Sequence, residues 1–103
     1  MERLYRGVQM GKSEITKMII ETIKDYLTTQ DIVHEINEQT SLIGKDAIVD
    51  SMGLVTIIID LESNFLDKGY EVSLTSEKAM SKKISPFRSV NALSNYIVEI
   101  LGV

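Results

Sequence analysis

Residues 51–65 read SMGLVTIIIDLESNF, and whether they form a helix or a strand decides the fold. The centre of this stretch, residues 54–59, is rich in β-branched side chains and would also suit a buried strand. On a helical wheel, however, where each residue turns by 100°, the polar and small residues fall within one arc of roughly 100°. They are Gly53, Thr56, Asp60, Ser63 and Asn64. A two-residue period would instead spread the isoleucines 57–59 over alternating faces and bury Asp60 or its neighbours. The pattern predicts a helix with an unusually wide apolar arc, which is either central in a bundle or partly exposed to a binding partner.

Two further stretches have helical periodicity. Apolar residues recur at spacings of three and four between Ser13 and Leu27, and Ser13 is the predicted N-cap of that helix. A last helix is predicted to begin after Ser89 as its N-cap and to end at Gly102. Each of these helices has one apolar face and one polar face, so each is expected to pack against the others.

The connections between these helices are long. Residues 28–49 are predicted to cross between the first two helices with one irregular helical turn at residues 32–36. Residues 76–80 suit a short helix capped by Ser76, and Ser85-Pro86 is expected to break the chain. Three long helices, one short third helix and a long loop between helices one and two predict an all-α four-helix bundle.

Composition excludes several classes of function. The chain has 103 residues, 44% hydrophobic and 25% charged, as expected of one globular domain. With no cysteine and one histidine, it is not expected to hold a disulfide or a metal. Its net charge of −4 argues against a surface for nucleic acid. No stretch is apolar over a bilayer-spanning length and no signal-peptide core is present, so we expect a cytoplasmic protein without a membrane contact.

Acidic side chains are concentrated in the middle of the chain. Residues 31–77 contain ten acidic and two basic side chains. Such a field raises the encounter rate with basic partners and weakens as salt is added. A role in solubility alone is the other interpretation of this pattern.

The sequence Asp50-Ser51-Met52 stands where the long loop meets the wide-faced helix. A helix N-terminus has unpaired N–H groups and the positive end of the helix dipole, which together stabilise a phosphate attached to a hydroxyl there. Asp50 or Ser51 could equally serve only as the helix cap. The three residues alone do not decide between these roles.

Their surroundings resemble the acyl carrier protein family of phosphopantetheine-binding carrier domains. Residues 42–55 read LIGKDAIVDSMGLV and continue into a hydrophobic helix with Glu62 and Phe65 near its end. Members of the family share an Asp-Ser-Leu or Asp-Ser-Met signature that opens helix two, and an acidic, Phe-containing end of that helix. Residues 85–90, SPFRSV, are similar to the start of the family's last helix. The likeness covers residues 12 to 101, which places an N-terminal extension at 1–11 and a carrier domain at 12–103.

The resemblance implies that Ser51 is esterified with 4′-phosphopantetheine, whose thiol carries acyl groups as thioesters in fatty acid, polyketide or related biosynthesis. Asp50 would then help a phosphopantetheinyl transferase and its metal ion to engage the serine. The chain would be a monomeric substrate carrier and not an enzyme, so no catalytic residue is expected. Its contacts with the transferase and with acyl-transferring or acyl-modifying enzymes would come from Met52, Val55, Ile59 and Glu62.

The chain also departs from the family pattern. Gly53 and Thr56 stand where many members carry acidic residues, and residues 66–85 form a longer connection than in the smallest fatty-acid carriers. A peptidyl or aminoacyl carrier protein is a close alternative, and an unmodified helical protein-interaction module of the same fold is another. A small serine hydrolase using Ser51 and His34 is a more distant one, because no oxyanion-hole loop or glycine-rich elbow accompanies them.

Overall fold

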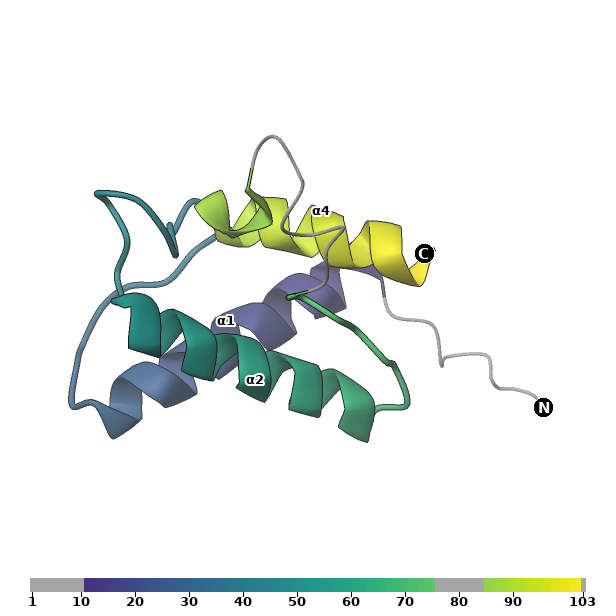
Figure 1. Ribbon diagram of the computed structural model, residues 1–103, viewed down its shortest axis with the longest axis horizontal. Coiled ribbons are helices and arrows are strands. Elements are labelled where there is room, and N and C mark those ends of the chain that lie inside the picture. Colours follow the sequence, from purple (N-terminus) through teal and green to yellow (C-terminus); the bar gives the residue numbers. More distant parts are fainter. Residues whose placement is uncertain (1–10, 76–84, 103) are drawn as a thin grey trace.

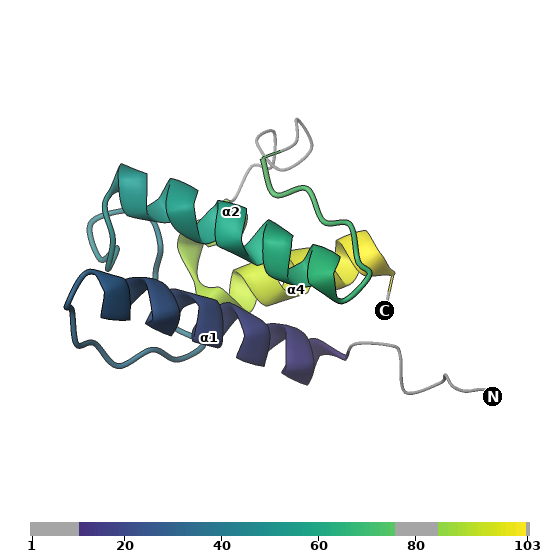
Figure 2. The ribbon, with the colours of Figure 1, turned by 90° about the horizontal axis from the view of Figure 1, so that it is seen from below.

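The computed structural model describes residues 11–75 and 85–102, and this part of the chain is helical and contains no strand. Its elements are α1 (Lys12–Thr29), α2 (Ser51–Asp67), the short 3₁₀ helix η2 (Pro86–Arg88) and α4 (Val90–Leu101). Helix α1 packs against both α2 and α4. Helices α2 and α4 run in the same general direction and α1 runs against them (Figures 1 and 2). The end of α1, the start of α2 and the loop between them therefore share one end of the molecule.

The core is built from the apolar faces that the periodicity predicts. Fully buried side chains recur along each helix at helical spacing, and they include Ile15, Ile19 and Ile23 of α1, Ile57, Leu61 and Phe65 of α2, and Val90, Leu93 and Ile97 of α4. Burying one such side chain contributes about 1.5–3 kcal/mol relative to leaving it in water. The three predicted long helices are thus confirmed, and each buries apolar side chains in the core.

Hydrogen bonds between side chains fix how α1 sits against its neighbours. Asn64 Nδ2 donates to Thr22 Oγ1 at 2.9 Å, which links α2 to α1. The hydroxyls of Thr16 and Ser94 lie 2.8 Å apart and link α1 to α4. Because Thr22 and Ser94 are buried, each hydroxyl needs such a partner, and a sliding of the helices would leave it unpaired.

The helix ends confirm one predicted cap and correct another. Ser89 caps α4 as predicted, since its Oγ accepts from the Ala92 N–H at 3.0 Å. Gly102 ends that helix in the left-handed conformation, with φ of 70°. Ser13, in contrast, is not the cap of α1. The N-cap position is two residues earlier, at Gly11, so the helix begins at Lys12 without a side-chain cap.

The long connections also differ in part from expectation. The helical turn predicted at residues 32–36 is wrong, because Asp31 takes a left-handed φ of 60° after α1 and the chain then continues without helical structure. The buried side chains of Ile36 and Leu42 anchor this loop to the core. The short helix expected at 76–80 lies outside the described residues. None of the described helices is both long and apolar enough to cross a membrane.

Candidate functional site

Asp50 organises the start of α2. Its backbone is extended at the N-cap position, and its Oδ1 accepts a hydrogen bond from the Gly53 N–H at 2.8 Å. Its carbonyl oxygen accepts from the Leu54 N–H at 2.9 Å, the first bond of the helical ladder. Of the two capping candidates in the sequence, the structure therefore selects Asp50 and leaves the Ser51 hydroxyl without a capping role.

Ser51 is the first residue of α2, and its side chain is exposed. Its hydroxyl forms no hydrogen bond with any described residue, and the N–H groups of Ser51 and Met52 likewise bond to no described acceptor. These two N–H groups and the helix dipole give the surroundings of the hydroxyl a positive partial charge. The arrangement presents an accessible nucleophilic oxygen where an attached anion is stabilised.

Gly53, on the opposite side of this first turn, is buried under the end of α1. A Cβ placed on it would lie 2.9 Å from Tyr26 Oη and 2.9 Å from Val49 Cβ. Real Cβ atoms essentially never come that close to another heavy atom, so any larger residue would push Tyr26 and Val49 away. This close approach gives a physical reason for a glycine at this position. It joins residues 27 positions apart, and local spacing in the sequence does not reveal it.

The predicted partner residues Met52, Val55 and Ile59 lie along one exposed line of α2. Their exposed fractions are 76%, 53% and 59%, whereas Ile57 and Leu61 of the same helix are fully buried. The spacing of three and four residues keeps them on one side of the helix. The wide apolar arc is therefore divided: part of it faces the core and part faces solvent. Of the two interpretations left open by the sequence, partial exposure is the one that the structure supports.

Glu62 has a structural contact that the sequence did not indicate. The side chain is half-buried, and its Oε2 accepts a hydrogen bond from the Leu74 N–H at 2.8 Å. Leu74 itself is fully buried, so this carboxylate helps to hold residues 70–75 against α2. The charge that was predicted to face a partner is thus already engaged within the chain through one of its two oxygens.

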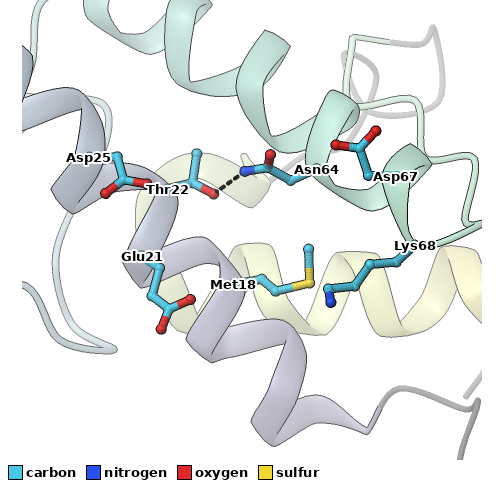
Figure 3. A pocket seen from close by; sticks show the side chains of 7 residues that line it. All are labelled: Met18, Glu21, Thr22, Asp25, Asn64, Asp67 and Lys68. Atoms are coloured by element: carbon cyan, nitrogen blue, oxygen red, sulfur yellow. Dashed lines mark hydrogen bonds between the residues drawn. The ribbon is translucent and has the colours of Figure 1, made fainter.

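Two open grooves follow α2 away from Ser51. The first lies between α1 and the second half of α2; Figure 3 shows the Thr22–Asn64 hydrogen bond across it. It is lined by Met18, Glu21, Thr22, Asp25, Asn64, Asp67 and Lys68, so it is largely polar. The second lies between α2 and residues 71–75, and Ile59, Leu66 and Val72 give it more apolar walls. Neither groove reaches the Ser51 side chain.

The remaining candidate groups do not gather at Ser51. The exposed His34 has its Nδ1 2.8 Å from the carbonyl oxygen of Glu35 and shares no hydrogen bond with Ser51, so the structure gives no geometry for a serine–histidine pair. Within residues 11–75 and 85–102, no three histidine or acidic side chains form a group that could bind a metal ion. Comparison of the chain with family models, with curated proteins and with solved structures gives no match.

Proposed function

We propose that this chain is an acyl carrier protein, which carries acyl intermediates as thioesters on a 4′-phosphopantetheine arm attached to Ser51 in fatty acid, polyketide or related biosynthesis. The observation that carries this proposal is the exposed hydroxyl of Ser51 on the first turn of α2, directly after the capping residue Asp50, with no hydrogen bond to any described residue. A serine that was present only to cap the helix would have its oxygen bonded to a backbone N–H.

The residues around Ser51 suit a phosphodiester. The N–H groups of Ser51 and Met52 bond to no described acceptor and are available to its oxygens, and the dipole of the 17-residue helix favours its negative charge. The Asp50 cap uses Oδ1, and its other carboxylate oxygen has no bond to a described residue, so it can face the metal ion of a transferase. The arm supplies a thiol, which this cysteine-free chain does not have.

The proposal includes the finer features that the resemblance implies. These are a four-helix bundle with a short third helix, a monomeric state, no catalytic activity of its own, and docking of partner enzymes through the charge of Glu62 and the apolar side chains of Met52, Val55 and Ile59. The exposure of these three side chains supports the docking role, because an apolar line in water is stabilised when a partner covers it.

That same line of apolar side chains supports a second candidate, an unmodified helical protein-interaction module. Such a module would bind a protein through Met52, Val55 and Ile59 without any use of the Ser51 hydroxyl. A peptidyl or aminoacyl carrier would use Ser51 in the same way as an acyl carrier and would differ in the group it carries.

Modification of Ser51 distinguishes the carrier from the module. The native chain is incubated with coenzyme A and a promiscuous phosphopantetheinyl transferase, and its intact mass is measured. We expect the mass to rise by one phosphopantetheine group. The variant Ser51→Ala should gain nothing, whereas Ser63→Ala, which removes another exposed serine of α2, should be modified like the native chain. An unchanged mass, under conditions that modify a known carrier, would favour the module.

A further inference from the structure

Ile32 and Val33 form an exposed apolar pair just after α1, which we call the lip. Val33 is fully exposed and Ile32 is 43% exposed. Outside α2, these are the exposed large apolar side chains of the described residues. The exposed parts of these two side chains, above all Val33, gain nothing within the fold and would be removed from water by a contact with another molecule.

The lip is held by the fold at both ends. On one side, the Ile32 N–H donates to the Leu27 carbonyl oxygen at 2.9 Å, which ties it to the last turn of α1. On the other side, Ile36 is buried in the core and the Asn37 N–H donates to Thr40 Oγ1 at 2.9 Å. A partner would therefore meet an anchored apolar surface and would lose little entropy in ordering it.

The lip lies at the same end of the molecule as Ser51. Ile32 borders an open groove at the start of α2 together with Ile48, Val49 and Asp50. Tyr26 and Gln30 line both this groove and the neighbouring one, which reaches Met52. The end of α1 and the start of α2 lie at the same end of the molecule in both views of the ribbon (Figures 1 and 2). Ile32 of the lip and Met52 thus line neighbouring grooves, and the groove at Ile32 reaches Asp50, the residue before Ser51. The surface from the lip to Met52 is the corner of the molecule at which α2 begins.

The charge around this corner selects the kind of partner. Among residues 31–50, the exposed charged side chains are one basic, Lys45, and five acidic, Asp31, Glu35, Glu38, Asp46 and Asp50. A second copy of the chain would bring the same acidic residues against these, and an anionic lipid surface would also repel them. A partner protein with an apolar pocket edged by lysine or arginine side chains is complementary to the lip in hydrophobicity and to the acidic residues in charge.

We propose that the lip is a docking contact for the phosphopantetheinyl transferase that modifies Ser51, an inference that rests on the proposed function. An enzyme that acts on the distal thiol of a long arm can work at a distance from the helix. An enzyme that modifies the Ser51 hydroxyl itself must bring its active site to that oxygen. It therefore has to cover the corner between Met52 and the lip. In its reaction, the bond from Ser51 Oγ to phosphorus forms, the P–O bond within the diphosphate of coenzyme A breaks, adenosine 3′,5′-bisphosphate leaves, and the hydroxyl proton passes to a base of the transferase.

The test is the steady-state rate of Ser51 loading by a phosphopantetheinyl transferase with coenzyme A. We expect the double variant Ile32→Ser, Val33→Ser to raise KM for the carrier at least about fivefold and to keep kcat within about twofold, because a contact made equally before and during the reaction is lost. The matched control is Leu66→Ser at the far end of α2, which removes an apolar side chain whose exposed fraction, 63%, lies between those of Ile32 and Val33. This control should load like the native chain, and both variants should keep the native thermal midpoint because the replaced side chains are exposed.

The outcomes separate the two proposals. If the native chain is loaded and the double variant keeps the native KM, the lip is not a transferase contact. The same conclusion follows if Leu66→Ser raises KM as much as the double variant does. If the native chain is not loaded at all, the proposed function fails and the lip inference fails with it. If the native chain binds phosphatidylcholine vesicles and the double variant does not, the lip is a membrane contact and the inference is overturned.

Discussion

Asp50 has one observed role and one proposed role at the residue scale. Its Oδ1 caps α2 through the Gly53 N–H, and in the proposed function its carboxylate also helps a transferase and its metal ion to reach Ser51. Capping needs only a side-chain oxygen that accepts a hydrogen bond, whether or not the side chain is charged. The role toward the transferase and its metal ion needs the negative charge of the carboxylate. A neutral residue with the same shape therefore separates them.

We predict that Asp50→Asn keeps the stability of the native chain and loses most of its loading rate. Asparagine caps helices as well as aspartate does, but its amide attracts a metal ion far less. Asp50→Ala should lose both properties, with a fall in the free energy of unfolding of about 1 kcal/mol. Urea unfolding and the rate of Ser51 modification measure the two effects. Native loading of Asp50→Asn would show that the carboxylate has no part in the reaction.

Gly53 gives a second test at this scale, because local propensity and packing predict opposite signs. Alanine favours a helix interior by up to about 1 kcal/mol over glycine. Its Cβ would, however, overlap Val49 and Tyr26 at 2.9 Å, and overpacking a tight contact costs about 1–3 kcal/mol. We predict that Gly53→Ala lowers the free energy of unfolding, as measured in urea.

A second substitution checks the cause of that loss. Tyr26→Phe removes the phenol oxygen that crowds the new Cβ and leaves Val49 in place. The effect of Gly53→Ala should therefore be smaller in the Tyr26→Phe background than in the native chain. If the urea midpoint of Gly53→Ala equals or exceeds that of the native chain, the predicted crowding is contradicted.

At the element scale, α2 divides its apolar residues between two environments. Ile57 is fully buried and Ile59, two positions later, is 59% exposed. We predict that Ile57→Ala lowers the free energy of unfolding by about 2–5 kcal/mol and that Ile59→Ala changes it by less than about 0.5 kcal/mol. Urea unfolding of the two variants measures the difference. Equal losses in both would mean that the outer face of α2 is covered within the molecule.

The boundaries of the elements show what a local pattern can predict. Periodicity located α1, α2 and α4 because each buries a stripe of side chains at helical spacing, and Ser89 was recognised as a cap from its place before such a stripe. The loop after α1 is harder to predict from a local pattern. The apolar spacing within residues 32–36 does not show that Asp31, just before them, takes a left-handed conformation. The course of the loop depends on Ile36, which is buried in a core formed by residues distant in the sequence.

The same distinction applies to the site at the scale of the whole molecule. The sequence predicted that Ser51 begins α2 beside Asp50, and Met52, Val55 and Ile59 do lie together on an exposed face. It did not predict the approach of Tyr26 to Gly53 or the bond between Glu62 and Leu74, because each joins residues from separate segments. Local motifs predict which residues are placed at a helix start, and tertiary packing decides which of their atoms remain exposed.

The proposed function depends on one oxygen atom, Ser51 Oγ, and localising the attached group shows whether that atom is the one modified. The whole chain is loaded with phosphopantetheine from coenzyme A, digested, and its peptides are fragmented in a mass spectrometer. We expect the added group on Ser51 and on no other serine. A group on another residue, or no group at all, would contradict the assignment of this chain as a carrier through Ser51.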